Sequence, residues 1–409
     1  MKTAKKIWTI TFLLALTSGT WAQTGRVTRT DIFQRPGDAS NFIVAYAPKE
    51  FSAWPANNGI WTWDHGNNIL VGFTYGVFEE KKGHNIVNAP EQNALARSTD
   101  GGKTWKRFQP EIYADQFLKK TQFKGKINFT HPHFAMKICS GGYHGHGKNG
   151  ANFYISYDCG STWSGPYIFN GLDKVKEIEG WEYTARTDYQ VVSKKECLIF
   201  FSARWDSKRT SDKTFVLRTT DGGQNFSFYS WVVPPPPADT CRAVMPHTVR
   251  LSDREYLTVI RRRHFDSSTD GWIEAYYSND SGKSWVSRSI VGYTGTSNGN
   301  PPSMVKMRDG RICVIYGNRS LRMMLGRISE DNGLSWGKEI ILRDDFTTDA
   351  GGESDLGYPR LTQNAEGKLV AIYYFSDTEH PEQHIACTLF SPDGMTDIPV
   401  KRSIVYSKK

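Results

Sequence analysis

An eight-residue pattern recurs five times along the chain and constrains the fold more than any other feature. Each copy reads S/T-x-D-x-G-x-T/S-W, although Asn225 and Phe226 end the third one. The copies lie about 50 to 63 residues apart, and a shortened sixth one begins at Ser391. The five full copies occupy residues 98–105, 156–163, 219–226, 278–285 and 329–336.

The residue types of this pattern predict a tight turn between two strands. The Asp carboxylate can accept hydrogen bonds from backbone N–H groups inside the turn. The Gly adopts backbone angles that other residues avoid, and the Trp can fold back to bury a large apolar area. Regular recurrence of such a unit is typical of a propeller, a solenoid or an array.

The segments between the turns alternate short β-rich runs with Gly, Asn and Asp turns. In the fourth repeat, residues 247–251, 255–260, 272–277 and 285–290 read as a four-stranded antiparallel meander, which is the unit of a propeller blade. The sequence therefore predicts an all-β fold, a six-bladed β-propeller of four-stranded antiparallel blades. The other units are residues 60–108, 134–169, 189–232, 303–342 and 361–406, the second of them irregular.

The two ends of the chain carry separate predictions. Residues 1–22 read as a secretory signal, with Lys2, Lys5 and Lys6 before an apolar run, so residues 23–409 form the propeller and the protein is exported, to the periplasm or beyond. Without the signal the formal charge falls from +9 to about +6. No later run is long enough to span a bilayer. Residues 26–33 are expected to close the ring as the outer strand of the last blade, where they would hide its edge.

Six cysteines are spread along the chain with no C-x-x-C spacing. We expect most of them to be small buried hydrophobic residues within strands, although an exported protein can form disulfides. The pair to test first is Cys139 with Cys159, within one repeat. No cysteine-based metal site is expected.

Blade geometry sorts the polar residues onto two faces of the disc. The first strand of each blade starts on the same face as the loop between its second and third strands, and the repeated turns lie on the other face. Most histidines and many arginines then gather at one end of the central channel, which predicts a concave, positively charged site. The predicted strand starts are 57–59, 131–133, 186–188, 245–247, 300–302 and 358–360, and the loops contribute His84, Arg204, residues 261–264, Arg319, His380 and His384.

The repeated turn on a six-bladed propeller resembles the sialidase (neuraminidase) superfamily, whose members are also called Asp-box or BNR-repeat proteins. The resemblance covers nearly all of residues 23–409. It implies a glycoside hydrolase in which arginines hold a substrate carboxylate, a tyrosine paired with a glutamate is the nucleophile, and an aspartate is the acid/base. Tyrosine nucleophiles are an exception to the two-carboxylate scheme of most glycosidases.

The resemblance assigns roles to a few positions of this sequence. Arg186 and Arg360, at two strand starts, would bind the carboxylate with Arg242 as a third candidate, since a guanidinium binds two oxygens at once. Tyr358 would be the nucleophile, with Glu182 and Glu353 nearby, and Asp188 the acid/base. The family's Arg-Ile-Pro motif at the first inner strand is replaced here by residues 57–60 (Asn-Asn-Gly-Ile), which favours an acidic sugar other than sialic acid.

Other residues at the same opening have open roles. His133 and His247 are candidate bases, while His131, Arg319 and one of the three residues 261–263 are candidate substrate ligands. Each has a structural alternative: the arginines could bond carbonyls where blades meet, Asp188 could pair with Arg186, and Tyr358 could be a packed aromatic. We expect no metal and no cofactor.

Three functions remain compatible with these residues. The first is an exported exo-acting glycoside hydrolase of sialidase-like type that removes a terminal acidic sugar from a glycan. The second is a polysaccharide lyase on uronate-containing glycans, with His133, His247 or Tyr358 as the base. The third is a non-catalytic glycan-binding propeller. In each case the partner is an acidic oligosaccharide bound by a monomer, and the basic residues form no stripe suited to nucleic acid.

Overall fold

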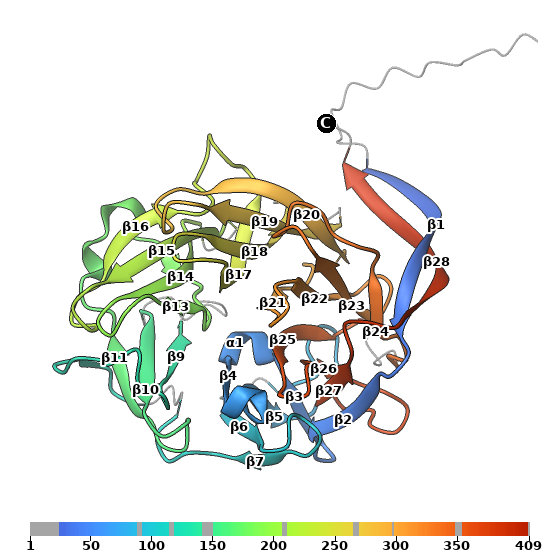
Figure 1. Ribbon diagram of the computed structural model, residues 1–409, viewed down its shortest axis with the longest axis horizontal. Coiled ribbons are helices and arrows are strands. Elements are labelled where there is room, and N and C mark those ends of the chain that lie inside the picture. The colour runs from blue at the N-terminus through green and yellow to red at the C-terminus, as the bar shows by residue number, and fades with distance from the viewer. Residues whose placement is uncertain are drawn as a thin grey trace, which may run out of the picture.

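The computed structural model describes residues 24–87, 92–113, 118–140, 150–206, 211–264, 270–296, 298–347 and 354–407. Six β-sheets surround a common axis, so the predicted all-β, six-bladed propeller is confirmed (Figure 1). Among the described residues, helix is confined to α1 (Pro55–Asn58) and three short 3-10 turns, η1 (Asp64–Gly66), η2 (Leu172–Lys174) and η3 (Lys176–Ile178). The helix α1 lies close to the axis.

The first three blades follow one another along the chain. Blade 1 comprises β3 (Glu50–Ala53), β4 (Ile60–Trp63), β5 (Asn68–Val77), β6 (Gln92–Ser98) and β7 (Lys106–Phe108). Blade 2 comprises β8 (Thr121–Gln122), β9 (Ala135–Cys139), β10 (Asn152–Ser156) and β11 (Ser164–Ile168). Blade 3 comprises β12 (Glu182–Tyr183), β13 (Tyr189–Val191), β14 (Cys197–Arg204), β15 (Lys213–Thr219) and β16 (Ser227–Trp231).

The last three blades complete the ring. Blade 4 comprises β17 (Arg242–Arg250), β18 (Tyr256–Arg263), β19 (Gly271–Ser278) and β20 (Val286–Gly295). Blade 5 comprises β21 (Pro302–Lys306), β22 (Ile312–Asn318), β23 (Met323–Ser329) and β24 (Ile340–Arg343). Blade 6 comprises β25 (Gly357–Gln363), β26 (Leu369–Phe375), β27 (His384–Phe390) and, as its outer strand, β2 (Ser40–Ala45).

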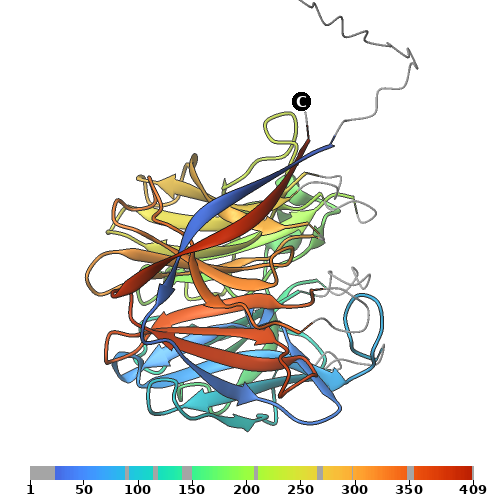
Figure 2. The same cartoon turned by 90° about the vertical axis from the view of Figure 1, so that its right-hand side faces the viewer.

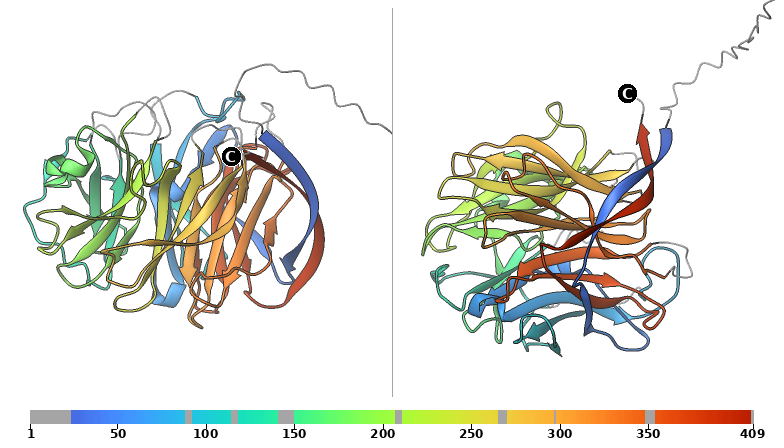
Figure 3. Two further views of the ribbon diagram at one scale, coloured as in Figure 1. Left: turned by 90° about the horizontal axis from the view of Figure 1, so that it is seen from above. Right: turned by 45° about the vertical axis from the view of Figure 1, so that its right-hand side comes forward.

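An N-terminal strand closes the ring as predicted, but it is not the expected segment. The outer strand of blade 6 is β2, which pairs antiparallel with β27. The prediction for residues 26–33 is wrong because they belong to β1 (Thr24–Pro36), which pairs along its whole length with β28 (Met395–Ser407). This two-stranded ribbon lies on the outer edge of blade 5 and joins β24 where Gln34 is opposite Ile340 (Figures 2 and 3).

Blade 2 is irregular, as expected, and its irregularity reverses one strand. Its innermost strand β9 pairs directly with β10, and the short β8 adds to the outside in parallel. Ala135 at the start of β9 is opposite Ser156, the first residue of the repeated turn. The innermost strand of blade 2 therefore begins on the face of the repeated turns, whereas the other innermost strands begin on the opposite face.

The innermost strands of four blades are interrupted halfway along their length. In blade 1 the helix α1 separates β3 from β4, and in blade 3 a gap separates β12 from β13. In blades 4 and 6 the pairing register shifts within β17 and β25. The strands of blades 1, 3 and 4 therefore begin several residues earlier than the sequence suggests, whereas β25 begins at Gly357, one residue before its predicted start. Most residues predicted to lie at these starts lie halfway down the channel.

The repeated turns have the predicted hydrogen bonds. In the first copy, Asp100 Oδ1 accepts the backbone N–H groups of Lys103 and Thr104 at 3.0 and 2.9 Å, and Oδ2 accepts the Thr104 hydroxyl at 2.6 Å. The Trp105 indole folds back and donates to the Gly102 carbonyl at 2.9 Å. Partial burial alone would raise the pKa of Asp100, but these bonds hold it at about 2.

The other full copies repeat this arrangement, and the shortened one does not. Asp158, Asp221, Asp280 and Asp331 each accept a backbone N–H four residues later. Asp393 of the sixth copy instead accepts the guanidinium of Arg311. Each full turn joins the third and fourth strands of its blade, so all five lie on one face, which we call the repeat-turn face.

All six cysteines are free thiols. Cys197, Cys313 and Cys387 are fully buried, as expected for small hydrophobic core residues, whereas Cys139, Cys159 and Cys241 are partly exposed. Cys139 and Cys159 lie at opposite ends of blade 2, since Cys139 ends β9 and Cys159 lies in the repeated turn.

The predicted signal, residues 1–22, lies outside the described residues. Within the described part of the chain, no helix has the length and apolar character needed to cross a membrane.

Candidate functional site

The candidate site lies opposite the repeat-turn face, at the inner end of blades 1, 4, 5 and 6. We call this the site face, defined by the first residues of β3, β12, β17, β21 and β25 and by the loops between second and third strands. Glu353, a candidate partner of Tyr358, lies outside the described residues. The remaining residues form two layers, an upper layer at the site face and a deeper layer in the channel. The upper layer comprises Trp54, His84, Arg261, Arg319, Asp355, Tyr358 and Tyr374.

Three residues at the strand interruptions have an unusual backbone conformation. Trp54, Met245 and Tyr358 have φ angles of 60°, 59° and 46°, and each precedes a proline. Non-glycine residues in this left-handed region cost on the order of 1–3 kcal/mol, and such strain clusters at functional sites. The three side chains belong to one hydrophobic cluster that also contains Tyr374, so blades 1, 4 and 6 together form its wall.

Tyr358 is held in place from two sides. Its backbone N–H donates to Asn300 Oδ1 at 2.8 Å, and Asn300 Nδ2 donates to the Leu356 carbonyl at 3.0 Å. The neighbouring Gly357 has a φ of 108°, and a Cβ there would lie 2.1 Å from Asn300 Oδ1. The buried Asn300 thus fixes the strained segment that positions the tyrosine ring.

The hydroxyl of Tyr358 contacts a buried arginine. Arg261 Nη1 donates to Tyr358 Oη at 3.1 Å, and its Nε donates to the Asn298 carbonyl at 2.8 Å. The same Nη1 lies 3.8 Å from the sulfur of Met245. Arg261 is therefore the member of residues 261–263 whose guanidinium contacts Tyr358; its role as a substrate ligand stays a prediction.

A carboxylate next to Tyr358 collects three further groups. Asp355, two per cent exposed, accepts the Tyr374 hydroxyl at 2.5 Å, Nδ1 of His84 at 2.9 Å and Nη2 of Arg319 at 3.3 Å. Burial would raise the pKa of Asp355, but His84 and Arg319 keep it below its ordinary value. Asp355 is consequently an ionised group that orients the His84 ring.

Aromatic contacts complete this layer. The Trp54 indole meets His84 edge-on with 5.0 Å between ring centroids, and Tyr358 meets Tyr374 at 6.0 Å. Arg319 Nη2 also donates to Tyr374 Oη at 3.0 Å. Burial alone would lower the pKa of Arg319, but Tyr374 and Asp355 raise it above its usual value. Arg319, a predicted substrate ligand, thus belongs to this layer together with Tyr358.

Arg186 and Arg360 lie one layer deeper, around the helix α1. Arg360 donates to the backbone carbonyls of Ala56 and Thr187 at 2.6 and 2.8 Å, while Arg186 donates to Asn57 Oδ1 at 2.6 Å. Lys137 is buried beside them and donates to Asn58 Oδ1 at 2.8 Å, and burial lowers its pKa to about 8. For Arg360 this geometry favours the structural alternative, because its donors join blades 1, 3 and 6.

Asp188 and His247 are also buried inside the channel. Asp188 accepts the backbone N–H and the hydroxyl of Thr248 at 3.2 and 2.9 Å, and burial raises its pKa to about 7. His247 Nδ1 accepts the backbone N–H of Met304 at 2.6 Å, and burial lowers its pKa well below the usual value. The structure does not bring either residue to the site face, because the interrupted strands begin earlier than expected.

Arg242 lies near the site face but is buried below the surface. Its Nε donates to Asp212 at 2.7 Å, and neither side chain is exposed. Burial would raise the pKa of Asp212, but Arg242 holds it below its ordinary value. Glu182 pairs with Arg204 at 2.5 Å in the neighbouring blade. The ion pair with Asp212 therefore gives Arg242 a structural role rather than contact with a substrate.

The expected position of His131 and His133 at the site face is wrong. The His133 carbonyl accepts the backbone N–H of Cys159, and the His131 ring lies 5.1 Å from that of Tyr157. Both partners belong to the repeated turn of blade 2, so the two histidines lie on the repeat-turn face. The cause is the reversed strand β9, whose start the sequence assigned to the other face.

A cavity of about 450 Å³ also lies on the repeat-turn face, between the turns of blades 1 and 2. It is lined by Arg97, Thr99, Thr104, Trp105, Lys106, Phe108 and Ser161. Arg97 donates hydrogen bonds through Nη1 to Asn68 and through Nη2 to the Cys159 carbonyl, so both terminal nitrogens of its guanidinium already have protein acceptors. This cavity therefore has no group comparable to the carboxylate and imidazole of the site face.

Sequence reasoning missed most of the contacts that form the upper layer. It placed His84 on the site face without a role, and it did not single out Trp54, Tyr374 or Asp355. The position of Asp355 was a possible signal, because it lies three residues before Tyr358 in the segment that leads into β25. The pairing of Asp355 with His84 joins positions 271 residues apart and has no local signature.

Comparison with known families agrees with this architecture. A BNR repeat-like domain model matches residues 39–371. The chain belongs to this family. The resemblance to sialidase-like BNR propellers is thereby confirmed at the level of family and fold. No match was found among curated protein sequences.

Solved structures with the same fold include proteins of known and unknown function. A protein of unknown function from Dyadobacter fermentans is 18% identical, with a TM-score of 0.63 over 88% of this chain and 99% of that one. The α-L-arabinofuranosidase Arb93A of Fusarium graminearum is 17% identical, with a TM-score of 0.52 over 86% and 97%. A Hadza microbial sialidase is 14% identical, with a TM-score of 0.54 over 84% and 66%.

Proposed function

We propose that this protein is an exported, exo-acting glycoside hydrolase that removes a terminal acidic sugar from a glycan. The observation that carries the proposal is the upper layer of the site face, where Arg261 and Arg319 flank Tyr358 beside the Asp355–His84 pair. The sialidase and the arabinofuranosidases among the structures of similar fold support glycoside hydrolysis as the reaction class.

Each group of the layer has a role in this proposal. Arg261 and Arg319 hold the sugar carboxylate, because guanidinium groups bind its two oxygens with directed hydrogen bonds. Tyr358 gives up its phenolic proton to solvent and attacks the anomeric carbon as the bond to the glycosidic oxygen breaks, and water then releases the sugar from the tyrosine. His84, oriented through Nδ1 by Asp355, exchanges a proton with the glycosidic oxygen through Nε2, as general acid–base catalysis requires.

A screen of the purified protein tests this function. Acidic glycans and a synthetic sialoside are incubated with enzyme, and each well is read for free sugar and for near-ultraviolet absorbance. We expect release of an acidic monosaccharide without a rise in absorbance. Tyr358→Phe should lower kcat by 10²-fold or more, whereas Tyr373→Phe should leave it unchanged. Tyr373 is a buried tyrosine of β26 that directly precedes Tyr374, and its hydroxyl forms a hydrogen bond with Thr388 in the blade interior.

Lyase chemistry is the second candidate, favoured by one feature of the site. Within the described residues of the upper layer, Asp355 is the one carboxylate and is tied to an imidazole, which is the arrangement of a base rather than of a carboxylate pair. In a lyase, His84 would remove the proton beside a uronate carboxylate that Arg261 and Arg319 neutralise. The glycosidic C–O bond would break and leave an unsaturated product, so rising absorbance would replace the hydrolase by the lyase.

The remaining parts of the proposal concern where and in what form the enzyme acts. Export rests on the signal-like residues 1–22, and N-terminal sequencing of the natural protein should find a mature start near Gln23. The working form is proposed to be a monomer, which sedimentation of the purified protein measures. Binding of an acidic oligosaccharide without any turnover would instead favour a glycan-binding module.

A further inference from the structure

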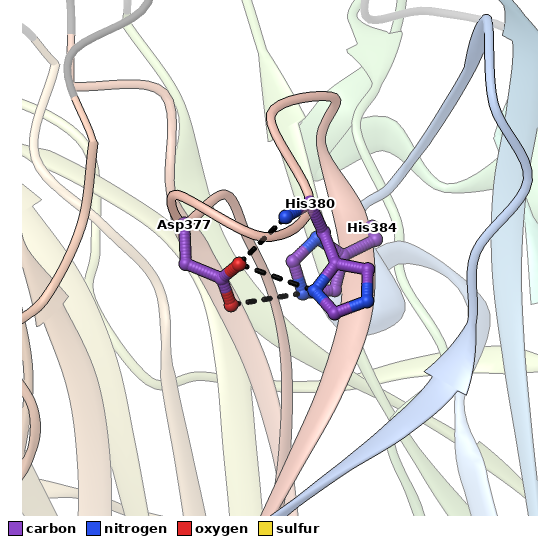
Figure 4. Close-up of side chains that lie close together, drawn as sticks. All are labelled: Asp377, His380 and His384. Atoms are coloured by element: carbon purple, nitrogen blue, oxygen red, sulfur yellow. Dashed lines mark hydrogen bonds and ion pairs between the residues drawn. The ribbon is translucent and has the colours of Figure 1, made fainter.

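We propose that Asp377, His380 and His384 form a binding site for one divalent transition-metal ion, of which zinc is the representative. The three residues lie on the loop between β26 and β27 and at the first position of β27 (Figure 4). Their ligand atoms lie within 4.8 Å of one another. The site is separate from the upper layer described above, and its test does not depend on the proposed function.

The tautomer of His384 is set by a backbone contact. Its Nδ1 lies 3.1 Å from the Glu382 carbonyl, which can only accept, so Nδ1 carries the hydrogen and Nε2 carries the lone pair. The His384 side chain is fully buried, and its Nε2 has no hydrogen-bond partner among the described residues. A backbone carbonyl on one ring nitrogen and an unused lone pair on the other is the usual state of a metal-binding histidine.

The unused nitrogen points toward the carboxylate of Asp377. Nε2 of His384 lies 3.9 Å from Asp377 Oδ2, and Nδ1 of His380 lies 3.1 Å from Asp377 Oδ1. An ion bonded to two atoms at 2.0–2.2 Å each spans separations of this size. In the free protein Nδ1–H of His380 donates a hydrogen bond to Asp377. A metal ion bound between the two residues would take the place of that hydrogen. Two imidazoles and one carboxylate leave a fourth position for water or a ligand oxygen.

The surroundings fix the loop and favour a dication. Oδ1 of Asp377 accepts the backbone N–H groups of Glu379 and His380 at 3.1 and 2.8 Å, which holds the turn. Tyr46 packs edge-on against both imidazoles, with ring centroids 4.7 and 5.9 Å away. Arg343 also contacts Oδ2 at 3.1 Å but is engaged by both oxygens of Asp345. Two carboxylates, those of Asp377 and Asp345, therefore share one guanidinium.

Zinc titration of the metal-stripped mature protein, residues 23–409, tests the proposal. We expect one equivalent of Zn²⁺ to bind in calorimetry and His380→Ala to weaken this binding by 100-fold or more. His65→Ala is the matched control, because His65 is exposed in a turn on the repeat-turn face and should bind zinc like the wild type. His384→Gln, which keeps the size of the buried side chain, should lose the site in the same way.

Cobalt distinguishes this site from cysteine ligands, since Cys241 Sγ lies 3.5 Å from Nδ1 of His264. With Co²⁺ we expect visible bands of a nitrogen- and oxygen-ligated ion, without the near-ultraviolet charge-transfer band of a thiolate. A thiolate band, no binding by the wild type, or equal binding by His380→Ala would each overturn the proposal. The partly exposed His380 decides the test if His384→Gln fails to fold.

Discussion

The two faces of the propeller are built in opposite ways. On the repeat-turn face, five copies of one turn satisfy their own hydrogen bonds, and each depends on residues within eight positions of sequence. On the site face, the upper layer joins single residues from blades 1, 4, 5 and 6 that lie far apart in the sequence. The repeat therefore specifies the fold, while function is expected where the blades depart from it.

The largest expected effect concerns the carboxylate of the site face. Asp355→Asn should lower kcat on the preferred glycan by about 10³-fold, because the amide no longer holds His84 in its proton-transferring state. Steady-state kinetics with melting curves measures this. Asp345→Asn, on a largely exposed carboxylate near the same face, should retain full activity. Equal loss in both variants would mean that Asp355 acts on the fold and not on His84.

A glycine pair separates strain at the site from strain elsewhere. Gly357→Ala should lower the free energy of unfolding by about 3 kcal/mol and reduce activity, because φ is positive and the new Cβ would meet Asn300. Gly367→Ala shares a positive φ of 85° but has open space around it, so it should cost about 1 kcal/mol and leave activity intact. Urea unfolding and assays of both variants test this, and equal costs would contradict the role of Asn300.

On the repeat-turn face, the expected loss is one of stability alone. Asp100→Ala removes an ionised acceptor of four hydrogen bonds and should cost about 2 kcal/mol, with kcat unchanged. Asp393→Ala, in the sixth copy that lacks these bonds, should cost less than about 1 kcal/mol. If both aspartates proved equally important, the turns would not be the stabilising units described above.

The smallest expected effect is a pH dependence within the channel. The pKa of Asp188 rises from 3.8 to about 7 on folding, so between these values the folded state keeps a proton that the unfolded state has lost. This group therefore stabilises the fold less as pH rises from about 4 to 7. Asp188→Asn should remove this trend, by about 1 kcal/mol between pH 6 and 7. Unfolding at both pH values measures it, and identical slopes for the two proteins would refute the assignment.

The fold was predictable because its signal is local and repeated. Turn chemistry such as that of Asp100 and Trp105 is written in eight consecutive residues, and the count of copies leads directly to the number of blades. The closing strand was assigned to the wrong segment because β1 and β28 pair along 13 residues each, a long-range match that no turn announces. The prediction for His131 and His133 in blade 2 failed for a related reason. The innermost strand of this blade runs in the opposite direction to those of the other blades, so the two histidines lie on the repeat-turn face.

The site was only partly predictable because its geometry depends on where strands are interrupted. Tyr358 and Arg319 were identified from their place near strand ends, and both belong to the upper layer. Asp188, His247 and Arg360 were assigned to the opening because the halfway breaks look like strand starts in sequence. The Asp355–His84 pair joins blade 6 to blade 1, and such a contact follows from ring closure rather than from any segment of the chain.

The most direct test of the central claim is a crystal structure of the protein with the acidic sugar that it releases or binds. The sugar should lie on the site face, with its carboxylate within hydrogen-bond distance of Arg261 and Arg319 and its anomeric carbon next to Tyr358. A sugar bound instead in the repeat-turn cavity beside Trp105, with the site face unchanged, would contradict it.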